Sequence, residues 1–224
     1  MTGQGTVIRI DVYSDVICPW CYVGKRRLER ALQQVGDAIT TRVVWRPFQL
    51  NPTMPNSGMD RRQYLDTKFG GPEAARAIYD QVAAAGAAEH IPFAFDRIAR
   101  TPHTFAAHRL IWWAGYQGKQ DELVERLFRR YFVEGGDIGS LETLSLVAAQ
   151  AGLDQTATET FLTGTEGVEA VKAEEAAGHR LGIRGVPYFV FNGTSALSGA
   201  QPPEQFVVVF QQLTGDTMAG KGGG

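Results

Sequence analysis

The segment Cys18-Pro19-Trp20-Cys21 constrains what this chain can fold into more than any other. It holds the only two cysteines among the 224 residues. Residues 6–13, before it, are mainly β-branched and aromatic, which is typical of a buried or half-buried strand. Residues 22–35, after it, have apolar side chains at spacings of three, four and seven, which predicts an amphipathic helix. The cysteine pair is therefore expected where a strand gives way to a helix.

The two cysteines are expected to differ in reactivity. Pro19 falls at the first helical position, where a proline is tolerated, so Cys18 becomes the N-cap. Its sulfur then lies beside unpaired backbone N–H groups, which lower a cysteine pKa from about 8.5 to roughly 3.5–7.5. Cys21, one turn into the helix and on its inward face, should be shielded and less acidic. We expect Cys18 to be an exposed attacking thiol and Cys21 a buried resolving thiol, which together make a thiol–disulfide exchange site.

Three other interpretations of the cysteine pair are weaker. A structural zinc site needs four ligands, and no second cysteine pair exists, so no metal site is predicted. The histidines, which are His90, His103, His108 and His179, are scattered along the chain. A structural disulfide that closes so short a loop would remove little chain entropy. Two inert thiols are conceivable in any intracellular protein, but the strand–helix junction favours redox chemistry.

A second informative segment runs from Gly182 to Gly193. The apolar run Tyr188–Phe191, followed by Asn192-Gly193, predicts a strand that enters a hairpin turn, because both central turn positions favour positive φ. Pro187 stands just before that strand and has no N–H for a sheet ladder. Its peptide bond is either cis, which leaves the Val186 backbone free to pair with a substrate, or trans at the first residue of the strand. Periodicity alone favours the trans form.

The remaining elements are read from periodicity and turn residues. We expect strands at residues 40–45 and 195–198, helices through residues 60–182, and a helix at residues 203–213. Residues 121–133 have the clearest apolar helical face, and Thr101-Pro102 is expected to begin a helix. Three successive cations, Lys25 to Arg27, point in different directions around the first helix, so they should form a solvated face.

In five segments the chain resembles DsbA-like thioredoxin-fold oxidoreductases, and their FrnE-like branch most closely. The segments are Ser14–Lys25, Thr104–Leu110, Tyr131–Ile138, Gly185–Val190 and Ser198–Gln201. They follow one another in the family's order and extend the resemblance over residues 7 to about 214. One departure is His103, where the family pattern has an asparagine.

Together with the expected elements, the resemblance implies an α/β protein with a thioredoxin-like fold and a large all-helical insertion. Residues 1–58 and 183–217 would form the thioredoxin-like domain, and residues 59–182 the helical insertion, packed over the active site. Residues 218–224 would be a flexible tail. The resemblance also implies a cis Val186–Pro187 bond facing the cysteines, with the Val186 backbone holding the partner of a mixed disulfide.

Four further side chains are candidates for the site. Asp15, just before the cysteine pair, could assist proton transfer or simply cap a turn. Trp20, between the cysteines, is expected to be exposed and to line a substrate surface. His103 and His108 lie at a helix expected to cover the active site, although a packed or exposed histidine is the commoner situation.

Composition agrees with a folded enzyme that binds neither nucleic acid nor membrane. Apolar residues make up 44% and charged residues 21%, the net charge is −2 and the pI is about 6.1. No apolar segment is long enough to span a bilayer, and residues 1–5 lack the pattern of a secretory signal, so a cytoplasmic location is expected. In a reducing compartment a cysteine pair of this kind is catalytic rather than structural.

The favoured function is that of a thiol–disulfide oxidoreductase. It would act on disulfide- or thiol-containing proteins or small molecules, with no bound cofactor besides its own redox-active disulfide. One alternative is a glutathione-dependent isomerase or transferase of the same fold in secondary metabolism, and glutathione is a candidate co-substrate. The 2-hydroxychromene-2-carboxylate isomerases and kappa-class glutathione transferases have that architecture, but carry serine in place of Cys18 and lack the second thiol. A non-enzymatic alternative is a thiol-linked scaffold or chaperone in a biosynthetic pathway.

Overall fold

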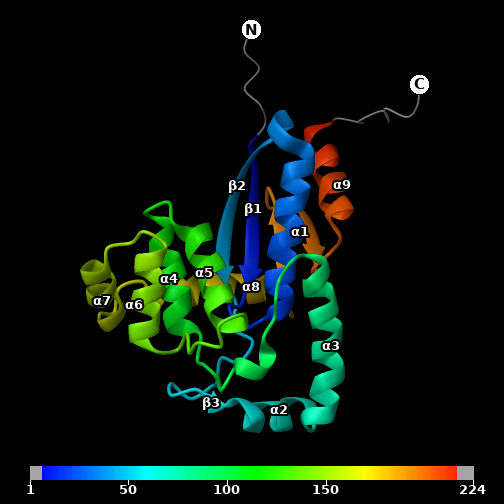
Figure 1. Cartoon of the computed structure of the whole chain (residues 1–224). Helices are drawn as coiled ribbons and strands as arrows, with labels where there is room; N and C mark the ends of the chain where they lie inside the picture. Colours follow the sequence, from blue (N-terminus) through cyan, green and yellow to red (C-terminus); the bar gives the residue numbers. More distant parts are fainter. Residues whose placement is uncertain (1–6, 216–224) are drawn as a thin grey trace.

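A four-stranded sheet lies at the centre of the computed structural model, which describes residues 7–215. The strands are β1 (Val7–Ser14), β2 (Thr40–Pro47), β5 (Tyr188–Phe191) and β6 (Ser195–Ser198). Their order is β2-β1-β5-β6, with β1 parallel to β2 and antiparallel to β5, and β6 antiparallel to β5 (Figure 1). This order, with a helix joining two parallel strands, agrees with the predicted thioredoxin-like fold.

Helices pack on both faces of this sheet. The helices of residues 7–215 are α1 (Pro19–Val35), α2 (Arg61–Phe69), α3 (Pro72–Ala88), α4 (Phe105–Gly115), α5 (Gln120–Phe132), α6 (Leu141–Gln150), α7 (Gln155–Thr163), α8 (Val168–Arg180) and α9 (Pro203–Thr214), with 3₁₀ turns at Gly36–Ala38 and Phe95–Arg97, and only some of them contact the sheet. α1 and α9 lie side by side on one face, where Phe189 of β5 meets Phe206 of α9 edge to face (Figure 1). α8 covers part of the other face, where Gly178 gives room to the ring of Tyr13.

The helices between β2 and β5 share a core with the sheet. The apolar face of α5 is buried, as the sequence predicts, and consists of Leu123, Val124, Leu127, Phe128, Tyr131 and Phe132. Phe128 stacks on Tyr22 of α1, with 5.0 Å between ring centroids, and meets Trp45 of β2 edge to face at 6.3 Å. The inserted helices are therefore packed onto the thioredoxin-like unit. The proposed domain boundaries at residues 58 and 182 stay a prediction.

The insertion also holds a small sheet, so it departs from the all-helical expectation. β3 (Met59–Asp60) pairs antiparallel with β4 (Arg100–Thr101). The helix expected at Thr101-Pro102 begins later, at Phe105, because Thr101 is a buried member of β4. No helix within residues 7–215 combines the length and the hydropathy that a membrane span requires. The tail predicted at residues 218–224 lies outside the described residues.

The cations at the start of α1 do not form a solvated face, so that prediction was wrong. The Lys25 side chain is only 3% exposed and contacts the carboxylates of Glu29, Asp121 (3.2 Å) and Glu125 (3.3 Å). Arg26 also pairs with Glu29 and Glu125. The reason is that α5 packs against this side of α1, which the spacing within α1 cannot reveal. These ion pairs tie the insertion to the thioredoxin-like unit.

Candidate active site

The cysteine pair lies at the N-terminal end of α1. Cys18 is the N-cap residue, with an extended backbone (φ −92°, ψ 111°), and Pro19 begins the helix. The Cys18 N–H donates to the Asp15 carbonyl at 3.0 Å, and the Cys21 N–H donates to the Cys18 carbonyl at 3.0 Å. Both cysteines are free thiols. A tight turn thus holds the sulfur of Cys18 at the positive end of the helix dipole, as the sequence predicts.

The exposure of the cysteine pair differs from the prediction. Cys21 is fully buried, as expected, but Cys18 is also buried, with 5% of its surface exposed. Trp20 is half-buried and packs against the core instead of standing free. The covering loop, which includes Val186, is far away in the sequence, so a local pattern could not show it.

Burial and the neighbouring thiol set the chemistry of Cys21. Burial raises the pKa of the Cys21 thiol well above its ordinary value, and the nearby Cys18 sulfur raises it further. The Ser14 hydroxyl and the Asp15 backbone, which lie near the Cys21 sulfur, act in the opposite direction on its pKa. The raised pKa favours the neutral thiol of Cys21, so a neighbouring base is needed to form the thiolate.

The loop before β5 faces the cysteines. The Val186–Pro187 peptide bond is cis. The Cys18 thiol donates to the carbonyl oxygen of Val186, with 3.4 Å between sulfur and oxygen. Regular pairing of β5 with β1 begins one residue after the proline, at Tyr188. The Val186 carbonyl, which takes no part in the pairing of β5 with β1, therefore lies against the sulfur of the N-cap cysteine.

Gly24 allows the proline to approach α1 closely. A Cβ atom at Gly24 would lie 2.9 Å from Cγ of Pro187 and 3.2 Å from Cζ of Phe189. Both distances are shorter than normal carbon–carbon contacts, so a side chain here would push the loop away. The glycine that follows the cysteine pair by three residues thus sets the distance between helix and loop.

Asp15 and His108 meet in the interior behind the cysteines. The Asp15 carboxylate is fully buried, and His108 of α4 is 3% exposed. Oδ1 of Asp15 lies 3.4 Å from Nε2 of His108, while Oδ2 accepts a hydrogen bond of 2.7 Å from the Leu50 N–H. Neither Oδ1 nor Nε2 has a hydrogen-bond partner within residues 7–215. Two buried polar atoms therefore face each other across the junction between sheet and insertion.

His103 lies close to this pair. Burial lowers the pKa of His103, the negative charges of Asp15 and Glu175 act in the opposite direction, and His108 lowers the pKa further. Its Nδ1 accepts a hydrogen bond of 3.3 Å from the Phe105 N–H at the start of α4. An asparagine side-chain oxygen can accept a bond of the same kind at the start of a helix. Within residues 7–215 no group of three or more His, Cys, Asp or Glu side chains is arranged to hold a metal ion.

The sequence did not single out several polar groups around the site. Ser14 and Gln49 each bury an oxygen that has no partner within residues 7–215. Glu175 of α8 accepts from the Gln49 backbone at 2.7 Å. Burial raises the pKa of Tyr79 on α3, a helix that packs against α1. These residues come from loops and helices whose approach depends on the whole fold, and no local signal marks them.

A paired thiol at the start of a helix, beside a cis-proline loop in this sheet, defines the chain as a DsbA-type thioredoxin-fold protein. The family model described as DSBA-like thioredoxin domain matches residues 9–211. The chain belongs to this family. A Streptomyces coelicolor structure described as a "probable DsbA oxidoreductase" is 32% identical, with a TM-score of 0.85 over 96% of this chain and 93% of the other.

More distant structures share the fold. The cytosolic disulfide reductase DsbM of Pseudomonas aeruginosa is 21% identical, with a TM-score of 0.64 over 93% of this chain and all of the other. A 2-hydroxychromene-2-carboxylate isomerase is 17% identical, with a TM-score of 0.70 over 92% of this chain and 95% of the other. The fold thus occurs in both oxidoreductases and isomerases, so the chemistry must be argued from the site. The assignment to the FrnE-like branch stays a prediction.

Proposed function

We propose that this protein is a thiol–disulfide oxidoreductase whose redox pair is Cys18 and Cys21. The observation that carries the proposal is the asymmetry of the two thiols. Cys18 lies at the open N-terminal end of α1, beside the Val186 carbonyl, whereas Cys21 is fully buried one turn further on. Stepwise disulfide exchange requires an attacking sulfur at the outer end of the pair, here covered only by the Val186 loop, and a protected second thiol next to it.

The exchange proceeds in two balanced steps. The Cys18 thiolate attacks one sulfur of a substrate disulfide, forms a mixed disulfide and releases the other substrate sulfur as a thiolate. Cys21 then loses its proton and attacks the Cys18 sulfur, which releases the second substrate thiolate and leaves a Cys18–Cys21 disulfide. Two electrons pass from the protein to the substrate, and the reverse sequence oxidises a substrate dithiol.

Asp15 and His108 are proposed to hold the proton that Cys21 gives up. The pKa of Cys21 is raised, so the second step needs a proton acceptor near a buried thiol. The Ser14 hydroxyl contacts the Cys21 sulfur, and the neighbouring Asp15 carboxylate faces His108. His103, at the outer end of this cluster, is proposed to connect it with solvent. These three residues would not touch the substrate, and would affect the exchange only through the proton of Cys21.

Val186 and Trp20 are proposed to contact the substrate. The Val186 carbonyl already accepts from the Cys18 thiol, and an extended peptide in a mixed disulfide can pair with the same backbone. The half-buried ring of Trp20 adds an apolar wall, and Pro187 sets the position of the loop. Disulfide-containing proteins and small disulfides, including glutathione disulfide, are the proposed substrates, and the cytoplasm is the proposed location.

Reduction of insulin by dithiothreitol tests the proposal. The wild-type protein should accelerate the appearance of turbidity, and Cys18→Ser and Cys21→Ser should each abolish the acceleration. A glutathione-dependent isomerase would behave differently, since it needs no second thiol. Unchanged insulin reduction by Cys21→Ser, or isomerisation of 2-hydroxychromene-2-carboxylate with glutathione by both variants, would favour that alternative.

A further inference from the structure

β2 is an edge strand whose outer side is only partly occupied. The Trp45 N–H donates to Oε1 of Gln120 at 2.8 Å, and Nε2 of Gln120 donates to the Trp45 carbonyl at 3.3 Å. The Gln120 amide thus makes the two hydrogen bonds that a neighbouring strand would make. Since backbone groups alternate between the two sides of a strand, Val43 and Thr41 also present their N–H and C=O groups outward. No residue among 7–215 is bonded to these groups.

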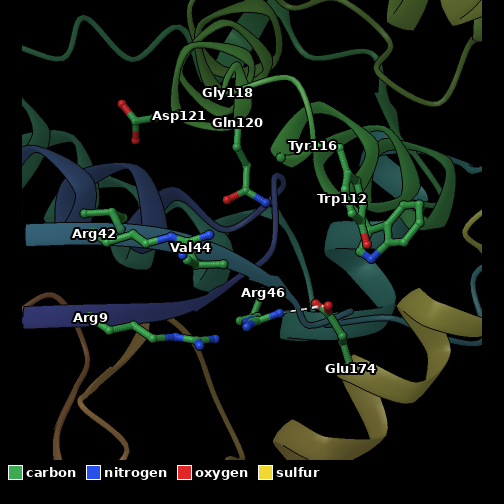
Figure 2. A pocket seen from close by; sticks show the side chains of 12 residues that line it. Arg9, Arg42, Val44, Arg46, Trp112, Tyr116, Gly118, Gln120, Asp121 and Glu174 are labelled. Atoms are coloured by element: carbon green, nitrogen blue, oxygen red, sulfur yellow. Dashed lines mark ion pairs between the residues drawn. The ribbon is translucent and has the colours of Figure 1, made fainter.

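A groove of about 500 Å³ lies beside this edge, and its lining extends from Val43 and Gln120 to Arg9 of β1 and Glu174 of α8. Figure 2 shows Gln120 reaching down to β2, with Trp112 of α4 and Tyr116, the residue that follows α4, on the same side. Tyr116 is 74% exposed, and its ring forms one side of the groove. Neither cysteine lines this groove, so it is separate from the candidate active site.

The unpaired charge of the groove is positive. Glu174 pairs with Arg46 at 2.8 Å, and Asp121 pairs with Lys25 at 3.2 Å, so both acids of the lining have cationic partners. Arg42 is exposed and has no acidic partner within residues 7–215. Figure 2 places Arg42 at the opposite end of the groove from the Arg46–Glu174 pair. An acidic group at this end of the groove would pair with Arg42. Among the described residues, Arg42 is the only cation of the lining without a counter-charge.

We propose that this groove binds an extended peptide segment of a partner protein that carries an acidic residue. The segment would pair with Val43 and Thr41 as a fifth strand, next to the Gln120 amide, and place its carboxylate against Arg42. Backbone pairing gives affinity in this mode, while the side-chain contact selects the partner. The aromatic rings of Trp112 and Tyr116 would cover the outer side of the added strand. This site would hold a partner independently of the thiol chemistry.

A fluorescein-labelled peptide, acetyl-Thr-Val-Glu-Val-Glu-Val-Thr-amide, tests the proposal by fluorescence anisotropy at low salt. The full-length protein should bind it, with chemical-shift changes at the Thr41 and Val43 amides. Val43→Pro removes only a backbone N–H that points away from β1, and an edge strand tolerates a proline at such a position. This variant should bind the peptide at least tenfold more weakly. Arg42→Glu should also weaken binding tenfold, while Arg62→Glu, an exposed arginine on α2, should not. Retained insulin reduction shows that each variant is folded.

Three results would overturn the proposal. The first is no binding of this peptide by the wild-type protein at millimolar concentration. The second is equal binding of a peptide with lysines for glutamates, or of one with N-methylated amides on the pairing side. The third is a dimer in sedimentation that Val43→Pro abolishes, because the edge would then pair with a second copy of the chain.

Discussion

Oδ1 of Asp15 lies 3.4 Å from Nε2 of His108, and neither atom is reached by solvent. Asp15 comes from the turn that carries the cysteine pair, whereas His108 comes from the inserted helix α4. The insertion therefore does more than cover the thioredoxin-like unit, because it places a histidine side chain against a buried carboxylate of the turn that carries the thiols.

Replacing Asp15 by Asn should slow the second step of exchange and leave the first nearly unchanged. Reaction with 5,5′-dithiobis(2-nitrobenzoic acid) separates them, since attack by Cys18 releases one chromophore and resolution by Cys21 releases the other. General-base catalysis typically contributes about 10²–10⁴-fold, so the second release should fall at least about 10²-fold at pH 7. The variant's second rate should then rise with hydroxide concentration.

Asp11→Asn is the matched control for this experiment. Asp11 lies on β1, four residues before Asp15, and its carboxylate accepts hydrogen bonds from Arg9 and Arg46 instead of facing His108. Its variant should keep the wild-type pH profile for both releases. Identical profiles for Asp15→Asn and the wild type would show that the Asp15–His108 pair is structural only.

Alkylation should distinguish the two thiols. Cys21 has a raised pKa and is fully buried, so its thiolate is scarce at neutral pH. Limiting iodoacetamide at pH 6 should label Cys18 several times faster than Cys21, and labelling of Cys21 should increase only well above pH 9. Peptide mass spectrometry gives both rates. Faster labelling of Cys21 would reverse the assignment of attacking and resolving thiols.

Gly24→Ala should impair the site through Pro187. The added Cβ would lie 2.9 Å from Cγ of Pro187, so the loop must shift away from α1. Overpacking of this kind costs about 1–3 kcal/mol, and the shift should also reduce insulin reduction severalfold. Gly185→Ala is the matched control, because a Cβ at Gly185 meets nothing within 4 Å. Equal stability and activity of the two variants, from urea unfolding and turnover, would contradict the role given to Gly24.

Lys25→Met should loosen the contact between α1 and α5. Burial lowers the pKa of Lys25, but Asp121, Glu29 and Glu125 outweigh it and raise the pKa. Removing this buried cation should cost about 1–3 kcal/mol of unfolding free energy at pH 7. Lys172→Met, which breaks an exposed pair with Glu169, should cost less than about 1 kcal/mol.

The cost of Lys25→Met should depend on pH with a defined sign. Burial alone would raise the pKa of Glu125, yet Lys25, Tyr22 and Arg26 hold it below its ordinary value of 4.5. A lowered carboxylate pKa contributes stability that is present above the unfolded value and lost as pH falls through the folded value. The difference between variant and wild type should therefore shrink below about pH 4. A constant difference from pH 7 to pH 3 would show that the effect is one of packing.

Local patterns predicted the elements that local residues determine. The helix at Pro19–Val35 and the strands at Tyr188–Phe191 and Ser195–Ser198 have their predicted bounds, because a proline and an Asn-Gly turn mark them. The apolar face of α5 was equally clear. The helix expected at Thr101 was wrong because pairing with Met59 draws that residue into a strand.

The sequence predicted the individual residues of the site, but not which of them contact one another. The sequence named Asp15 and His108 separately, whereas their contact depends on how α4 packs behind the sheet. The exposure expected for Cys18 was wrong for a similar reason, since a loop from the far end of the chain covers the sulfur. Burial and pairing of this kind arise from long-range packing, which spacing along one element does not contain.

A redox titration shows whether Cys18 and Cys21 act as one redox pair. The protein is equilibrated in glutathione or dithiothreitol buffers of graded potential, quenched and alkylated, and the fraction of free thiol is measured by intact mass. We expect one reversible two-electron transition between the thioredoxin value of about −270 mV and the DsbA value of about −120 mV. Failure to form an intramolecular disulfide at any potential, with thiols that stay independent, would contradict it.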